Sequence, residues 1–145
     1  MTGTEVSDLR EWVRGLRAGV LSTRLDGEGG LPFGSLVPFV VLGNACVGLY
    51  LSPLAQHSKN LNAFAGASLT LWDEPASPSS GSRRICLVGR AEVATSGVDA
   101  PFKAKYPETA AWKGLGFVHW SLRVERAHVV RGFGSAGWIE PADIL

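Results

Sequence analysis

The stretch LYLSPLAQHSKNLNAF, residues 49–64, decides the fold, because a strand runs directly into a helix there. Ser52 and Pro53 are typical of a helix start: the serine oxygen accepts from free amides of the first turn, and the missing N–H of proline costs nothing there. The apolar residues that follow share one helical face, so we expect this helix to pack on a core. They are Leu54, Leu61, Phe64 and Ala65.

The first turns of this predicted helix carry four side chains that can donate hydrogen bonds, namely Gln56, His57, Ser58 and Lys59. Free backbone amides and the positive end of the helix dipole add to these donors, and together they favour an anion such as a phosphate. The alternative interpretation is a well-capped surface helix whose polar residues face water.

Short strands separated by tight turns dominate the rest of the chain. We expect strands at 19–25, 34–43, 45–52, 67–73 and 83–95, and one or two more over 116–133. Helices are expected at 4–17, at 98–113 with an interruption at Pro107, and from Pro141 after a turn at 134–140; residues 74–82 are expected to form a loop. Pro38 predicts a bulge or an unpaired N–H in its strand, and Gly89 predicts a bulge.

Six or seven short strands with few helices predict a mainly β fold, a small antiparallel barrel with helices covering its ends. An open sandwich is the alternative, since periodicity does not separate the two. A chain of 145 residues is expected to form a single domain, with an N-terminal helix over 1–17 and the barrel over 18–145.

Composition excludes several classes of protein. The chain is 46% apolar and 19% charged, which is typical of a globular protein, and its net charge of +1 gives no reason to expect nucleic acid or a membrane surface as a partner. No apolar run approaches the length of a membrane span, and the N-terminus has no hydrophobic signal core. We therefore expect a cytoplasmic protein, in which Cys46 and Cys86 are buried thiols; a disulfide between them is the alternative.

No hydrolytic constellation and no metal-ligand spacing stands out, so the pattern identifies no catalytic residue and no metal site. The three histidines differ in setting. His57 lies on the candidate anion-binding helix, His119 alternates with Val118 and Trp120 and so faces the other side of its strand, and His128 is expected to be exposed.

Five runs occur in an order that resembles the split-barrel flavoprotein superfamily of pyridoxamine 5'-phosphate oxidases, closest to its haem-utilisation branch and to the CREG-type barrels. They are PFGSLVPFV (32–40), LYLSPLAQHSKNL (49–61), ASLTL (67–71), RRICLVGRAEV (83–93) and GFGSAGWI (132–139). The resemblance covers nearly the whole chain from about residue 17. It implies a six-stranded split β-barrel, a homodimer and, where a flavin is bound, a groove between the subunits that holds it.

The resemblance also implies roles for individual residues. Ser52, Gln56 and His57 match positions around the phosphate of FMN, with Ser58 in the same turn and Lys59 as a second basic residue. Gly34, Ser35, Leu36 and Val37 match the strand that lines the flavin ring, and Arg84 and Gly89 match a later strand facing the groove. Trp138, with Gly134 and Ala136, matches the C-terminal segment that closes the pocket from the second subunit.

Two positions depart from the flavin-binding pattern. Such oxidases usually have an arginine on the ring-lining strand, where this chain has Ser35, and an Arg-Lys pair at the phosphate, where it has Gln56 and His57. Each replacement removes a charge-assisted hydrogen bond worth about 1.5–3 kcal/mol.

Two functions follow from these observations. The first is an FMN-dependent oxidoreductase that acts on a small molecule; it needs few catalytic side chains, because the flavin performs the electron transfer. The second is a CREG-like barrel that binds haem or no cofactor, with its groove filled by side chains such as Trp138 or Phe133. Haem requires an axial ligand, and the sequence does not single out one histidine. A deazaflavin is a third cofactor that the pattern does not distinguish from FMN.

Overall fold

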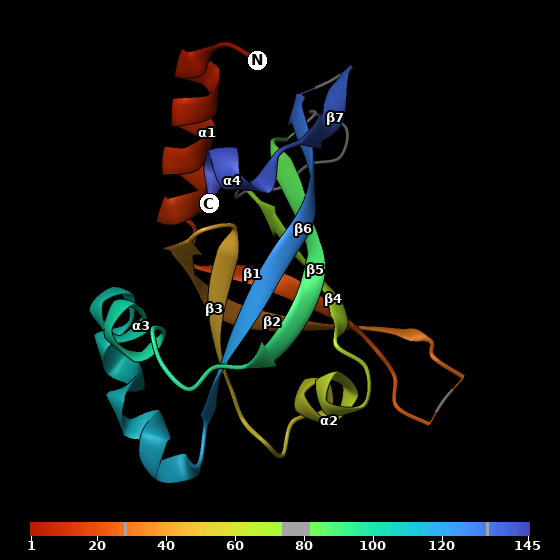
Figure 1. Ribbon diagram of the computed structural model, residues 1–145, viewed down its shortest axis with the longest axis vertical. Coiled ribbons are helices and arrows are strands. Elements are labelled where there is room, and N and C mark those ends of the chain that lie inside the picture. Colours follow the sequence, from red (N-terminus) through yellow and green to blue (C-terminus); the bar gives the residue numbers. More distant parts are fainter. Residues whose placement is uncertain (28, 74–81, 133) are drawn as a thin grey trace.

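The computed structural model describes residues 1–27, 29–73, 82–132 and 134–145. Seven strands form one antiparallel sheet in the order β3-β2-β1-β4-β5-β6-β7, and β3 also pairs with β6. The first six strands therefore close into a barrel, and β7 extends it at one edge (Figure 1). The strands are β1 (Ala18–Arg24), β2 (Pro32–Gly43), β3 (Cys46–Leu51), β4 (Gly66–Trp72), β5 (Arg84–Val93), β6 (Val118–Gly132) and β7 (Ser135–Ile139). This confirms the predicted antiparallel barrel over the sandwich.

Helices cover the barrel. They are α1 (Gly3–Gly15), α2 (Gln56–Ala63), α3 (Asp99–Lys105), the 3-10 helix η2 (Pro107–Leu115) and α4 (Pro141–Ile144). In Figure 1, α1 and α4 lie beside each other at the upper part of the barrel, α2 lies at its lower end, and α3 with η2 lies to one side. None of the described helices is both long and apolar enough to cross a membrane.

Alternate strand residues point into the barrel and form the main core. Leu21, Leu49, Leu69, Leu87 and Leu122 are completely buried there, and Leu9, Leu61 and Ile144 seal it from α1, α2 and α4. Burial of these side chains stabilises the fold by roughly 1.5–3 kcal/mol each. A second, mainly aromatic cluster around Tyr50, Phe102 and Tyr106 holds α3 and η2 against β2 and β3.

Pro38 lies where β2 changes its partner. The pairing of β2 with β1 ends at Pro38, opposite Ala18, and its pairing with β3 begins at Phe39, opposite Leu49. The register shift of β2 lies between Val41 and Gly43, away from the proline. Of the two expectations for Pro38, the bulge is wrong. The alternative, a position without a paired N–H, agrees with a proline placed where one ladder ends and the next begins.

The predicted bulge at Gly89 is confirmed. The register of β5 against β6 shifts between Val88 and Gly89. A Cβ atom added to Gly89 would lie 1.9 Å from the carbonyl oxygen of Arg123 and 3.0 Å from the Cα of Val124. Only glycine fits at this bulge, because the neighbouring backbone occupies the space of a side chain.

The helix after β3 begins later than predicted. The carbonyl of Ser52 accepts from the amide of Ala55 at 3.1 Å and from the hydroxyl of Ser58 at 2.6 Å, which holds the intervening residues in a turn. Helix α2 therefore starts at Gln56 without a side-chain cap. Leu54 lies in the turn and is 83% exposed, and Phe64, beyond the helix end, is 43% exposed; of the predicted apolar face, Leu61 is deeply buried.

Several other predictions can be compared with the structure. The turn expected at 134–140 is wrong: Ser135–Ile139 forms β7, because it pairs with β6 across the turn at Gly134. The helical region interrupted at Pro107 is confirmed as α3 and η2, and the short helix from Pro141 as α4. Cys46 and Cys86 are free thiols, each half-buried rather than buried. Residues 74–81 of the predicted loop, and Phe133, lie outside the described residues.

We predict that Gly89→Ala destabilises the protein by about 3 kcal/mol, the upper end of the usual cost of overpacking, because the atom in the way belongs to the backbone. The measurement is urea unfolding followed by circular dichroism. Gly137→Ala in β7 is the matched control, since nothing lies within 4 Å of a Cβ at that position. Equal stability of the two variants would contradict the assignment of the bulge.

Candidate functional site

The strand predicted to line a ligand ring and the helix predicted to bind an anion meet at one contact. The Ser35 Oγ atom on β2 and the His57 Nδ1 atom in the first turn of α2 lie 3.0 Å apart. Burial lowers the pKa of His57, so its neutral form is favoured. Among the described residues the Nε2 atom of His57 has no hydrogen-bond partner and is hidden from solvent. The fold therefore leaves one imidazole nitrogen unpaired beside β2.

The other predicted donors of this helix differ in availability. The Ser58 hydroxyl donates to the Ser52 carbonyl, and the Ser52 Oγ accepts from the amide of Leu54 at 3.3 Å, so both serines serve the turn. The Gln56 side chain donates to Asn60 at 2.9 Å, whereas Lys59 is exposed. The amides of Gln56 and His57, at the first two helical positions, have no partner within the helix.

Asn60, which the sequence analysis did not single out, ties this helix to the barrel. It is completely buried, its amide nitrogen donates to Thr23 Oγ1 at 3.0 Å, and its oxygen accepts from the backbone of Asp26 at 3.0 Å as well as from Gln56. A buried amide with all these partners fixes α2 against the end of β1. The sequence gives one indication of this role. Asn60 follows Gln56 by four residues, the spacing at which two side chains meet on a helix, and it precedes the apolar Leu61.

The remaining predicted site residues are separated from this contact. Val37 is 2% exposed and belongs to the barrel core, whereas Leu36 is 69% exposed on the outside of β2. Arg84 lies at the start of β5 and Trp138 on β7, at the opposite end of the molecule from α2 (Figure 1). Within one chain, the structure brings Ser35 and His57 together, and Arg84 and Trp138 lie elsewhere.

Leu36 and Trp138 nevertheless stand on the same outer face of the sheet. They are the two ends of one row of directly paired residues that crosses six strands, and no member of this row is charged: Leu36, Val20, Thr70, Cys86, His128 and Trp138. All six are half-buried or exposed. On β1, β4 and β5, the residues directly before and after each member of the row are buried, so they face the inside of the barrel. We call these six residues the outer row. A parallel row of Gly34, Ser22, Ser68 and Val88 lies beside it and is also uncharged.

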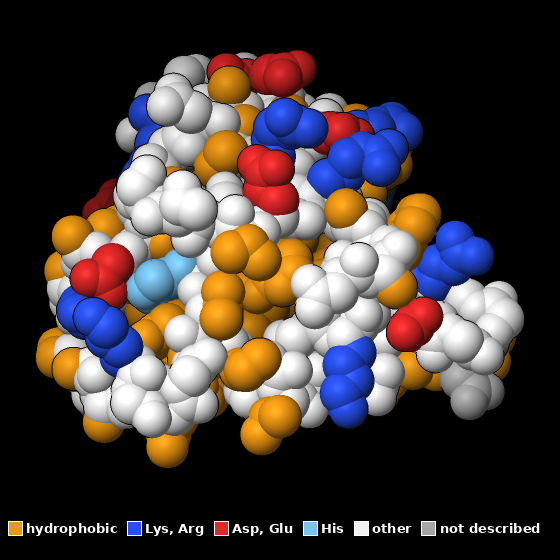
Figure 2. Space-filling model, turned by 60° about the horizontal axis from the view of Figure 1, so that its bottom comes forward, with side chains coloured by type: hydrophobic (Ala, Val, Ile, Leu, Met, Phe, Trp, Pro, Cys, Tyr) orange, Lys and Arg blue, Asp and Glu red, His pale blue; other side chains and the backbone are white. Residues whose placement is uncertain are grey.

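The lower face of the molecule is apolar as well. Figure 2, which turns the bottom of Figure 1 forward, shows hydrophobic side chains gathered near the middle of this face, with the charged side chains mostly further out.

The three histidines have separate environments. His119 stacks on Tyr50 with ring centroids 3.9 Å apart, and its Nε2 lies 3.1 Å from an oxygen of Asp99, which leaves its Nδ1 buried. Hydrogen bonds from Lys103 and His119 lower the pKa of Asp99. His128 is half-exposed on the outer row. Its ring and the Trp138 ring meet in a T-shaped arrangement, with their centroids 5.0 Å apart. The described residues contain no cluster of three or more side chains able to hold a metal ion.

Comparison of the sequence with protein-family models and with curated proteins gives no match. Solved structures do match. A haem-binding protein from Mycobacterium smegmatis is 26% identical and superimposes with a TM-score of 0.79 over 99% of this chain. The match covers 60% of that protein, so this chain spans less than two thirds of its length.

Two further structures extend the comparison. A protein of the pyridoxinephosphate oxidase family from Clostridium acetobutylicum, related to general stress protein 26, is 14% identical with a TM-score of 0.71 over the whole of both chains. An FAD-binding protein from Mesorhizobium loti is 14% identical with a TM-score of 0.64 over 88% of this chain and 92% of that one. The chain therefore has the split-barrel fold of the pyridoxamine 5'-phosphate oxidase-like proteins, as its sequence predicts. Structures with this fold bind flavin in one case and haem in another.

We predict that His57 makes the stability of the protein fall in mild acid. Since burial lowers its pKa below the ordinary value of 6.5, the unfolded chain binds more protons at this ring between the two pKa values. The neutral ring therefore contributes its full share of the free energy of unfolding when the pH is above the ordinary pKa. This share is lost as the pH falls through the lowered pKa of the folded state. From about pH 7 to about pH 5, the free energy of unfolding should fall more steeply for the parent protein than for His57→Gln.

Urea unfolding at each pH measures this difference, and titration of the His57 ring protons by NMR provides the check. A ring that titrates at or above the ordinary histidine value would contradict it.

Proposed function

We propose that this chain is a flavin-binding split barrel that works as a homodimer, and that it transfers electrons between FMN and a small molecule. The contact between Ser35 and His57 carries the proposal, because it joins the strand that would line the flavin ring to the helix that would hold the phosphate. FMN, when bound, supplies the redox chemistry, and the chain supplies binding, orientation and exclusion of water.

His57 fits an oxyanion as a neutral donor. If the Ser35 hydroxyl donates to Nδ1, the ring proton lies on Nε2. This N–H is hidden from solvent, so a phosphate would have to displace the groups that cover it before the N–H could donate to a phosphate oxygen. The free amides of Gln56 and His57 and the dipole of α2 act at the same place. Lys59, which is exposed on the same turn, adds the positive charge that the family pattern usually takes from an Arg-Lys pair.

The outer row supports the homodimer. The six side chains of the row are uncharged, with the guanidinium of Arg126 lying 3.7 Å from the Trp138 ring centre at its end. Such a strip suits a second copy of the same surface. A dimer through this face would bring Leu36, Arg84 and Trp138 of two subunits close to one groove, although they are separated within a chain. This pairing would make the groove incomplete in a monomer.

We predict that the purified protein binds FMN and that His57→Ala with Lys59→Ala weakens the binding by about 2–4 kcal/mol, because two donors to the phosphate are lost. Quenching of flavin fluorescence and the flavin absorption bands measure binding. Lys113→Ala, an exposed lysine of η2, is the control and should bind as the parent does. Unchanged affinity in the double variant would place the phosphate elsewhere, and a protein that takes up no FMN would overturn the flavin proposal.

We also predict a dimer that depends on the outer row. Leu36→Glu should shift sedimentation towards the monomer, because a carboxylate would be buried without a partner at the interface. Leu115→Glu is a closely matched control: Leu115 is 69% exposed, as Leu36 is, but lies at the end of η2. A parent protein that is monomeric, or equal effects of the two variants, would contradict this interface.

Haem is the second candidate, and one observation favours it beyond the haem-binding structure described above. Of the three histidines, His57 and His119 each have one ring nitrogen paired and the other hidden, whereas His128 is half-exposed on the outer row beside Trp138. His128 would then be the axial ligand. A Soret band that appears on haem addition and is altered in His128→Ala, in a protein that does not bind FMN, would establish this function in place of the first.

A further inference from the structure

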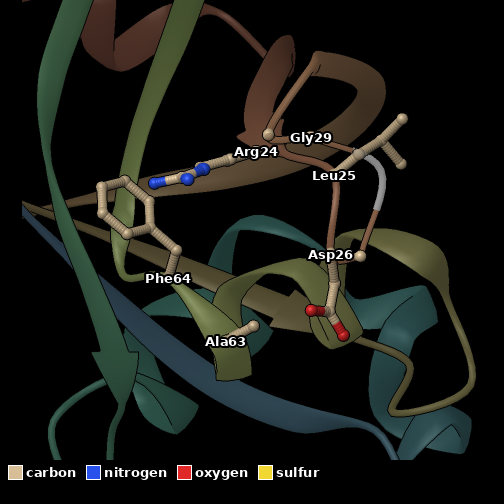
Figure 3. Close-up of a pocket in the computed structure, with 8 residues that line it drawn as sticks. Arg24, Leu25, Asp26, Gly29, Ala63 and Phe64 are labelled. Atoms are coloured by element: carbon tan, nitrogen blue, oxygen red, sulfur yellow. The ribbon is translucent and has the colours of Figure 1, made fainter.

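A guanidinium group lies beside a hollow on the outside of the barrel, and its hydrogen-bond donors have no partner among the described residues. Arg24 ends β1, and its guanidinium carbon lies 4.9 Å from the centre of the Phe64 ring. It also lies next to Gly30, where an added Cβ would lie 2.4 Å from Arg24 Nε. The guanidinium therefore lies close to both an aromatic ring and the backbone of a glycine. Figure 3 shows it extending towards Phe64.

These two contacts restrict the position of the guanidinium without using its N–H groups. Among the described residues, Arg24 has no hydrogen bond and no ion pair, and the cation–π contact with Phe64 is its one recorded interaction. Four of the described arginines, in contrast, are paired with acidic groups, for example Arg90 with Glu125 at 3.4 Å and Arg131 with Glu5 at 3.0 Å. A positioned guanidinium with free donors recognises planar oxyanions through two parallel hydrogen bonds.

A hollow of about 470 Å³ lies in front of this group. It is bounded by the glycine-rich β1–β2 connection and the end of α2, through Leu25, Gly29 and Ala63. Asp26 also lines it, but Figure 3 shows its carboxylate pointing away from Arg24, so the guanidinium is not neutralised by it. Gly29 and Gly30 both have positive φ values, 68° and 74°, which leaves their backbone open to close approach.

A second hollow of about 390 Å³ adjoins the first, and Phe64 lines both. Its walls are mostly small or apolar and include Ser22, Ser68 and Val88 of the outer sheet face. The pair of hollows thus offers the Arg24 guanidinium at one end and, at the other, a mostly small and apolar surface bordered by the ion pair of Arg90 with Glu125. A small molecule with an anionic group and an apolar body matches this arrangement.

We propose that Arg24, Phe64 and Gly30 form an oxyanion-binding site that takes the carboxylate or phosphate group of a small planar molecule. It is separate from the start of α2, where His57 and Lys59 lie, and goes beyond the function proposed above. The body of the ligand lies against Phe64 and Val88, and its anionic group accepts hydrogen bonds from Arg24.

The test uses the whole chain without added cofactor, and its probes are benzoate and inorganic phosphate, with neutral benzamide and matched sodium chloride as references. Nuclear magnetic resonance follows the Nε–H signal of Arg24 and the amides of Gly29 and Gly30 during each titration. We expect a saturable shift with benzoate, with phosphate, or with both, and none with benzamide or chloride. A response to benzoate alone identifies the ligand group as a carboxylate, and a response to phosphate alone identifies it as a phosphate.

Variants separate the site from general charge effects. Arg24→Gln should weaken binding roughly tenfold or more, since charge-assisted hydrogen bonds are lost. Arg14→Gln, an exposed arginine on α1, should leave it unchanged. Gly30→Ala should weaken binding by displacing the guanidinium, and thermal unfolding confirms that each variant is folded. Since Arg24 is exposed, Arg24→Gln is the variant on which the decision rests.

The proposal is overturned if neither anion gives a saturable shift, if chloride gives the same shift, or if Arg24→Gln binds as Arg14→Gln does. FMN and haem titrations report on other residues, so failure of the proposed function and failure of this site are distinguishable.

Discussion

The structure depends on two strands that change their partners partway along. β6 pairs with β3 from Val118 to Arg123 and with β7 from Ala127 onward, while it pairs with β5 through most of its length. β2 passes from β1 to β3 at Pro38 and Phe39. Because both changes occur, the sheet can close through β3 and β6 and still extend into β7. The close packing of Gly89 against the backbone of Arg123 and Val124 lies at the change in β6, and a bulge supplies the local twist needed there.

Closure of the barrel separates two surfaces with different chemistry. Among the described residues, leucine, valine and phenylalanine side chains fill the inside of the barrel and are almost completely buried there. Recognition must then occur at the ends and on the outside. The end near α2 provides Ser35, His57 and first-turn amides, and the outside provides the outer row and the Arg24 hollow. All the proposed binding chemistry therefore lies on surfaces that the closed barrel positions but does not enclose.

The helix α2 shows how a polar segment is anchored without a capping side chain. Ser58 bonds back to the Ser52 carbonyl, and Asn60 bonds to Thr23 and to the Asp26 backbone. These buried hydrogen bonds hold the helix against β1, so His57 faces β2 and Lys59 faces solvent. Rigid anchoring of this kind reduces the entropy that a ligand must remove on binding.

The sequence by itself determined most of the strands, the antiparallel pairing and the bulge at Gly89, because periodicity, glycine and turn residues act locally. The choice of a barrel over a sandwich came from the order of the family-like runs, since periodicity alone does not separate the two. The sequence-based prediction misplaced the start of α2 and the strand β7. The hydrogen bonds of Ser52 and the pairing of Ser135–Ile139 with β6 form only in the folded chain, and no local residue pattern specifies them. Only the tertiary structure decided that Leu36 and Trp138 share one row, that Asn60 anchors the helix, and that Gly30 and Phe64 lie next to the guanidinium of Arg24. These arrangements depend on strand register and on side chains meeting across the fold, and no local pattern of residues specifies either.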